Sequence, residues 1–184
     1  QTMSQTLILG CNRGKLIKYE MGPADTEWQK TTTLRLSQSV TDVVQLSDRL
    51  IVAVQDEATF DVVDLETFVS VSHTSDLVGL YKSYKTRLTL RSGELAVADT
   101  NGFFVVNMEP GAGDAITFSV SEEAYCKNHT ATDFLEYERD RFLVCILEGE
   151  FFYQIVRPKK SKGQFALNSL SVKSKVSERG SHEE

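Results

Sequence analysis

The chain repeats one hydrophobic and polar pattern four times: an apolar segment, a short polar turn and a second apolar segment. In the first copy, residues 7–11 and 16–20 flank the turn at 12–14. The other copies pair 50–54 with 60–64, 95–98 with 103–106, and 142–146 with 151–156. The segments are rich in β-branched and aromatic residues and most of the turns in Gly, Asn and Asp, which favours antiparallel hairpins over helices.

The spacing of the turns fits one four-stranded sheet per repeat. Their anchors are separated by 44, 44 and 47 residues: Gly14, Ala58, Gly102 and Gly149. Further candidate strands precede two of the hairpins, at 40–49 and 131–141. Others follow each hairpin, at 31–36, 68–72, 116–120 and 165–170. A period of this length is typical of repeat architectures built from small sheets.

The inner strands are almost continuously apolar, which implies that both of their faces are covered. Small sheets stacked face to face around an axis provide such cover. A sandwich of two sheets would leave one face in water, and its strands would alternate between apolar and polar residues. The sequence therefore predicts an all-β fold built from blades of four-stranded antiparallel sheets.

These features resemble a divergent WD-repeat β-propeller over about residues 5–172. In that family a repeat begins near Gly-His and its third strand ends in Trp-Asp. Here His73 and His129, each followed by Thr, stand at the start position, and Tyr19-Glu20 and the Val-Asp-Leu-Glu-Thr segment at 63–67 stand at the Trp-Asp position. We expect the two histidines to form hydrogen bonds at strand edges rather than to act as catalytic bases or ligands.

The number of repeats predicts about four blades over residues 1–172, followed by a flexible tail at 173–184. The first unit has no strand ahead of its hairpin, and the propellers of this family usually have about six to eight blades. Because an open arc leaves sheet edges exposed, we expect this chain to be part of a larger propeller. The alternatives are two copies that close an eight-bladed ring, a partner chain that supplies blades, and a closed four-bladed ring.

Charge and cysteine content exclude several classes of protein. A net charge of −6 argues against nucleic-acid binding, which relies on clustered Lys and Arg. Cys11, Cys126 and Cys145 have neither the pairing of a disulfide framework nor the spacing of a zinc site, which favours a cytoplasmic protein. A glycosylation sequon at Asn128 is the one contrary signal, and no apolar run is long enough to span a membrane.

The C-terminal segment differs from the rest of the chain in charge. Residues 157–184 contain seven Lys or Arg and three Asp or Glu, a net charge of +4, so residues 1–156 have −10. We expect a solvated terminus. An electrostatic contact of its lysines, Lys159 and Lys160 among them, with an acidic partner or an anionic membrane is the alternative.

The sequence contains no nucleophile motif, phosphate-binding glycine loop or cluster of metal ligands, and no cofactor is expected. The predicted function is therefore a non-catalytic protein-interaction scaffold within a larger complex. Its contact surface is expected in the long connections at 22–29, 76–87 and 109–114. The candidate contact residues there and in the tail are Trp28, Tyr81, Lys82, Tyr84, Lys85, Lys159 and Lys160. The alternative is a propeller with a small-molecule or catalytic site at its central channel, formed from Asp42, Asp133, His73 and His129.

Overall fold

A computed structural model of the chain describes residues 4–89, 94–120, 125–147, 151–156 and 166–171. Fifteen strands occur in this part, arranged in one three-stranded and three four-stranded antiparallel sheets. The described residues contain no helix, so no helix among them could span a membrane. The all-β fold class predicted from the hairpin pattern is confirmed.

Each sheet is a consecutive stretch of the chain. The first contains β1 (Gln5–Cys11), β2 (Lys15–Met21) and β3 (Gln29–Arg35). The second contains β4 (Val40–Gln45), β5 (Leu50–Gln55), β6 (Thr59–Asp64) and β7 (Val69–Thr74). The third contains β8 (Ser83–Leu88), β9 (Glu94–Asp99), β10 (Gly102–Pro110) and β11 (Ile116–Val120). The fourth contains β12 (Ala131–Glu138), β13 (Arg141–Ile146), β14 (Phe151–Val156) and β15 (Ala166–Ser171).

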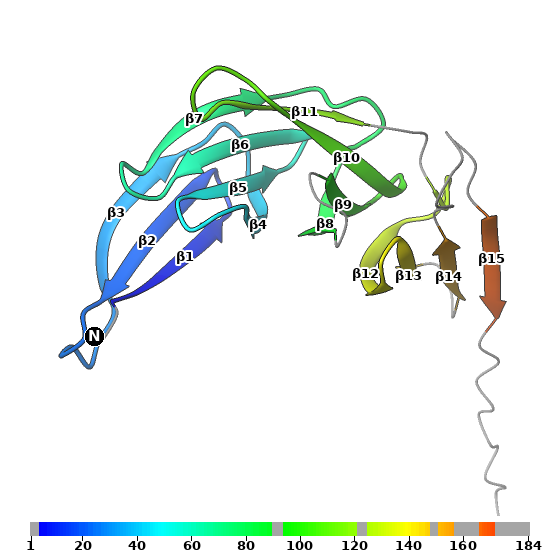
Figure 1. Ribbon diagram of the computed structural model, residues 1–184, viewed down its shortest axis with the longest axis horizontal. Helices are drawn as coiled ribbons and strands as arrows, with labels where there is room; N and C mark the ends of the chain where they lie inside the picture. Colours follow the sequence, from blue (N-terminus) through cyan, green and yellow to red (C-terminus); the bar gives the residue numbers. More distant parts are fainter. Residues whose placement is uncertain (1–3, 90–93, 121–124, 148–150, 157–165, 172–184) are drawn as a thin grey trace, which may run out of the picture.

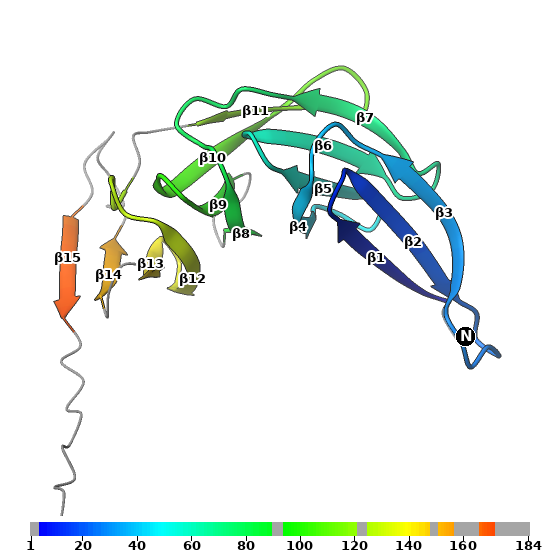
Figure 2. The same cartoon turned by 180° about the vertical axis from the view of Figure 1, so that it is seen from behind.

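The four sheets follow one another along an arc (Figures 1 and 2). Their first strands line one side of it, where β4 packs against β8 and β8 against β12. Strands β7 and β11 contact each other on the outer side, where Ser72 Oγ donates a hydrogen bond to the carbonyl of Ile116. The sheets are therefore stacked blades, as the repeat predicted.

Strand β8 is an element that the sequence analysis placed inside the connection at 76–87. Its sequence, Ser-Tyr-Lys-Thr-Arg-Leu, is too polar to show the apolar pattern of the other inner strands. Two of its polar side chains, those of Ser83 and Thr86, are nevertheless buried. The third blade thereby gains the inner strand that the hydrophobic pattern did not reveal.

The first sheet corresponds to the second, third and fourth strands of the next one. The β2–β3 register shifts between Lys18 and Tyr19, where the β6–β7 register shifts between Val62 and Val63. The hydrogen bond from the Leu36 N–H to the Gly14 carbonyl likewise matches that from Leu77 to Ala58. Among the described residues, the first blade therefore has no inner strand beside β1.

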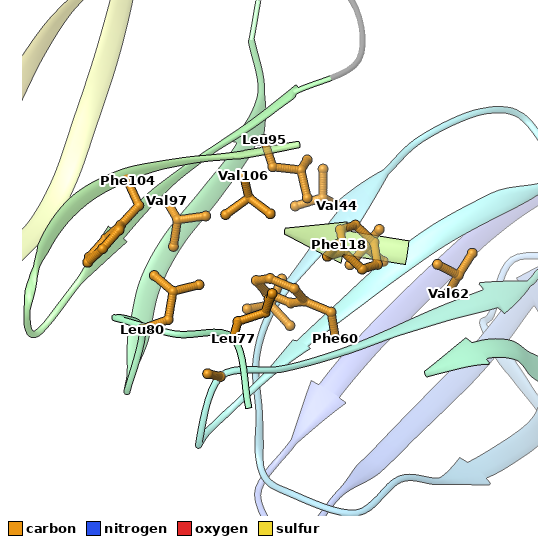
Figure 3. Close-up of a cluster of buried hydrophobic side chains, with 13 residues drawn as sticks. Val44, Phe60, Val62, Leu77, Leu80, Leu95, Val97, Phe104, Val106 and Phe118 are labelled. Carbon is orange, nitrogen blue, oxygen red and sulfur yellow. The ribbon is translucent and has the colours of Figure 1, made fainter. Parts of the chain in front are cut away.

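Three apolar cores fill the spaces between successive sheets. The largest lies between the second and third sheets, and Figure 3 shows its side chains converging from both. Phe60 and Phe118 meet there edge to face, with ring centroids 5.1 Å apart. Leu16, Ile51 and Val63 belong to the core between the first two sheets, while Phe103, Phe134 and Phe142 belong to the core between the last two. Cohesion between blades is thus mainly apolar.

Candidate functional site

The antiparallel strands divide the connections between two ends of the sheets. The hairpin turns at 12–14, 56–58 and 100–101 lie at the same end as the links from one sheet to the next. We call this end the hairpin-turn end. Tyr81, Lys82 and Tyr84 lie there, whereas Trp28 and the connection at 111–115 lie at the opposite end. The structure therefore does not gather the predicted contact residues into one surface.

The connection from β7 to β8 is anchored by apolar side chains that alternate with exposed ones. Leu77 and Leu80 are buried in the large core, while Val78 is 86 % and Tyr81 61 % exposed. Gly79 between them has φ +95°, and a Cβ there would approach a ring carbon of Phe104 to 3.0 Å. A side chain at this position would be strained, so glycine allows the connection to lie flat on the third sheet.

Asp99, at the end of β9, holds the backbone of this connection in place. Its two carboxylate oxygens accept the Tyr81 N–H at 3.1 and 3.0 Å, and one of them also accepts the Asn101 N–H at 2.9 Å. The Asn101 side chain donates to the Gly79 carbonyl at 2.9 Å. Burial raises the pKa of Asp99, and these hydrogen bonds act in the opposite direction. The exposed side chains therefore project from a fixed backbone.

Lys82 and Tyr84 line a hollow of about 600 Å³ at the hairpin-turn end. Its other walls come from the first two sheets and include Arg13, Ser39 and Asp56. Tyr84 is exposed on β8 itself rather than in a loop. Three successive sheets thus contribute to one uneven surface with exposed aromatic, apolar and charged side chains.

Lys85 also lies on strand β8, and its side chain is half-buried next to the inner strand β4. Its charge lowers the pKa of Asp42, although burial, the larger effect, raises it. Lys85 therefore belongs to the packing between inner strands and not to the loop surface. Lys159 and Lys160 lie outside the described residues.

The four residues proposed for a central-channel site are not brought together. Asp42 and Asp133 are on β4 and β12, which β8 separates. Asp42 accepts the Val43 N–H at 2.9 Å and the Thr86 N–H at 2.7 Å, so it links two blades. His73 is on the outer strand β7, and no group of three metal-ligating side chains occurs within the described part of the chain.

His73 belongs to a polar set that the sequence analysis did not find. Its Nδ1 lies 3.1 Å from Oδ2 of the buried Asp61. Asp61 also accepts hydrogen bonds from Gln55 Nε2 and Ser70 Oγ, each at 2.6 Å. The signal in the sequence was an aspartate within the apolar strand β6, because a buried carboxylate requires partners. The expectation that His73 forms a strand-edge hydrogen bond is met.

Comparison with known proteins supports the fold alone. No family model matches the chain, and no curated protein matches its sequence. The β-propeller domain of Cps50 (Swd1) from Myceliophthora thermophila is similar at 14 % identity and a TM-score of 0.58, covering 84 % of this chain and 53 % of that domain. An active polycomb repressive complex 2 in its basal state contains a chain that is 13 % identical, with a TM-score of 0.64 over 85 % of this chain and 34 % of the other.

A humanised mutant of the Chaetomium thermophilum polycomb repressive complex 2 gives a similar match, at 13 % identity and a TM-score of 0.64. It covers 85 % of this chain and 35 % of the other. The fold is thus that of a WD-repeat-like β-propeller, as the repeat predicted. The chain spans about half of the Swd1 domain and about a third of the two polycomb chains.

Proposed function

We propose that this chain is a non-catalytic scaffold, a part of a larger protein complex, and that the connection at 77–82 makes contact with a partner protein. The observation on which this rests is the pair of exposed side chains, Val78 and Tyr81, on a backbone held by the buried Asp99. Tyrosine is enriched at the centres of protein interfaces, and a fixed loop loses little conformational entropy on binding.

The architecture and the structural neighbours agree with this proposal. Rigid blades hold connections in fixed positions, which suits a surface that several proteins contact. Two of the similar chains are from polycomb repressive complex 2, so the same fold acts inside an assembly there. We extend this to protein partners in general and to a cytoplasmic location, where the unpaired Cys11, Cys126 and Cys145 would stay reduced.

A paired substitution tests the contact. Val78→Ser with Tyr81→Ala removes the exposed apolar surface and leaves the buried Leu77 and Leu80 in place. We expect proteins that co-purify with the tagged chain, quantified by mass spectrometry, to decrease at least about tenfold, as for a central interface residue. The matched control is Val69→Ser with Tyr137→Ala, which changes the same residue types at exposed positions elsewhere. Equal recovery with both double variants would contradict the proposal.

A further inference from the structure

Three successive sheets form the hollow of about 600 Å³ at the hairpin-turn end. Arg13 comes from the turn between β1 and β2, Asp56 from the turn between β5 and β6, and Lys82 from the connection that leads into β8. Among the described residues that line the hollow, these three are the charged ones, so positive charge exceeds negative charge there. This sign is opposite to that of residues 1–156 as a whole, whose net charge is −10.

Hydrogen bonds hold the backbone of each charged residue in position. The Arg13 N–H donates to Ser39 Oγ at 3.3 Å, and the Asp56 N–H donates to the Ser39 carbonyl at 3.0 Å. The Lys82 carbonyl accepts the Thr100 N–H at 3.1 Å. The charged side chains therefore extend from a fixed backbone, which reduces the conformational entropy that is lost when they bind a ligand.

The two cations of the hollow are available to a ligand. Arg13 and Lys82 are exposed, and neither forms an ion pair within the part of the chain that the structure describes. Arg49, by contrast, has its Nε 2.6 Å from a carboxylate oxygen of Asp64. Guanidinium and ammonium groups form strong hydrogen bonds with carboxylates, so two such groups suit a ligand with two acidic side chains.

Asp56 adds a requirement for a hydrogen-bond donor. Its Oδ1 is shielded from solvent and has no hydrogen-bond partner among the described residues. Asp56 lines the hollow, and rotation of its carboxylate exchanges the two oxygens. A ligand that brings a donor would remove the cost of this unsatisfied acceptor. A peptide carries a main-chain N–H beside each acidic side chain, so it offers both the donor and the anions.

We propose that the hollow binds an acidic segment of a partner protein, with carboxylates on Arg13 and Lys82 and a main-chain N–H on Asp56. Tyr84 lines the same hollow and is 41 % exposed, so its hydroxyl is a further donor. Recognition of acidic motifs by clustered cations is a recurrent mode of peptide binding. The inference rests on the proposed contact at 77–82, because Lys82 belongs to both, and it assigns the charge of the partner segment.

A rhodamine-labelled peptide, Gly-Ser-Glu-Asp-Glu-Ser-Gly, serves as the probe for the full chain, and Gly-Ser-Gln-Asn-Gln-Ser-Gly is its uncharged counterpart. We expect saturable binding of the acidic peptide by fluorescence anisotropy and no binding of the uncharged one. The affinity should fall at least about tenfold between about 50 and about 500 mM NaCl, because salt screens exposed charges. Absence of saturable binding, or equal binding of the two peptides, would overturn the proposal.

Charge reversal locates the bound peptide. Arg13→Glu with Lys82→Glu should weaken binding of the acidic peptide at least about tenfold, because two attractions become repulsions. The matched control is Lys30→Glu with Arg35→Glu, which makes the same change of charge at exposed positions on β3 and should alter binding by less than about threefold. Equal weakening by both double variants would mean that the peptide responds to net charge alone, and the proposal would be wrong.

Asp56 distinguishes an acidic ligand from a basic one. Asp56→Asn keeps an acceptor oxygen and removes the negative charge, so the affinity for the acidic peptide should stay the same or increase. The basic peptide Gly-Ser-Lys-Arg-Lys-Ser-Gly tests the opposite case. If the basic peptide binds and Asp56→Asn abolishes its binding, the hollow takes a cation and the proposal is wrong.

Co-purification separates this inference from the proposed contact. Proteins that are lost with the double variant Val78→Ser and Tyr81→Ala should also be lost with Arg13→Glu and Lys82→Glu. If the charge-reversed variant retains them, the contact at 77–82 stands and the acidic partner segment is refuted. If the Val78→Ser and Tyr81→Ala variant itself loses no protein, the proposed contact is wrong, and peptide binding still decides the chemistry of the hollow.

Discussion

Strands β9 and β13 occupy equivalent positions in neighbouring sheets, but they are buried to different extents. Every residue of β9 is buried, whereas β13 alternates between buried and partly exposed residues. Both strands contain an uninterrupted apolar run, at 95–98 and 142–146. An apolar strand can be buried on both faces, but each face is buried only where a neighbouring sheet packs against it. The third sheet lies between two others, and the fourth has a described neighbour on one face.

The first sheet also has residues that are more exposed than their equivalents in the next sheet, on the face turned away from that sheet. Leu7 and Leu9 of β1 correspond in register to Ile51 and Ala53 of β5. Leu9 is 41 % exposed, whereas Ala53 is fully buried. The two end sheets of the arc therefore expose apolar residues at positions whose equivalents are buried in the middle sheets. The predictions below test this difference by comparing equivalent positions.

The largest difference is expected when a charge is placed on the face directed toward the following sheet. Val54 and Cys145 hold equivalent positions there, and Val54 is fully buried. Val54→Asp should lower the free energy of unfolding by about 4 kcal/mol or more, because a carboxylate would lose its water. Cys145→Asp should lower it by about 1–2 kcal/mol, because this position is partly exposed and the carboxylate keeps part of its water. Urea unfolding measures both, and equal losses would show that the face of the fourth sheet is covered.

Truncation of apolar side chains should also lower the free energy of unfolding more in the second sheet than in the fourth, but by a smaller difference. Val52→Ala leaves a cavity in the core between the second and third sheets and should cost about 2 kcal/mol. Leu143→Ala removes a larger side chain at the equivalent position of β13, but should cost only about 1 kcal/mol because this position is partly exposed. A greater loss for Leu143→Ala in urea unfolding would contradict this account of the ends.

Asp42 and Asp133 provide a polar version of the same comparison. Each accepts the N–H of the next residue, at 2.9 and 2.8 Å, and within the described residues Asp42 also accepts a hydrogen bond from a following blade, from Thr86. Asp42→Ala should cost about 1–2 kcal/mol, because two backbone N–H groups lose their acceptor. Asp133→Ala should cost under about 0.5 kcal/mol. Thermal unfolding measures the pair, and addition of a further blade should increase the cost at Asp133.

The smallest expected effect is the pH dependence of the Asp42 link. Burial raises the pKa of Asp42 above its ordinary value of 3.8. The folded state then holds the proton more tightly than the unfolded state, so the contribution of Asp42 to stability falls as the pH rises from 3.8 through the folded-state pKa. The stability of wild type relative to Asp42→Asn should therefore decrease between about pH 3.5 and about pH 6. Urea unfolding at both values checks the sign, and an increase would refute it.

The strands and their grouping were predictable because their residues carry a strong local signal. The segment at 116–120 coincides with β11, and the other predicted strands overlap the observed ones. Strand β8 was missed because Lys85 and Arg87 interrupt the apolar pattern, and the burial of Ser83 and Thr86 depends on neighbouring sheets. Local sequence shows which residues prefer a strand conformation. Whether a polar strand is buried depends on sheets that are distant in the chain.

The candidate site was predictable only in part. The unusual length of the connection between two predicted strands pointed to the segment that contains Tyr81, Lys82 and Tyr84. The same criterion also pointed to the connection that contains Trp28, which lies at the opposite end of the sheets. The sequence placed Asp99 in a turn, and its hydrogen bonds to Tyr81 come from 18 residues away in the chain. Hydrogen bonds between distant backbone segments leave no periodic signal, so this role required the structure.

By itself, the sequence determined the all-β class, the period of the blades and the hairpins within them, because strand preference and turn chemistry act over a few residues. The tertiary structure decided which apolar faces are covered, which end of the sheets each connection occupies, and that Asp42 joins two blades. Each of these depends on a neighbouring sheet that is distant in the chain. Identical local patterns can therefore be buried in the middle of the arc and exposed at its ends.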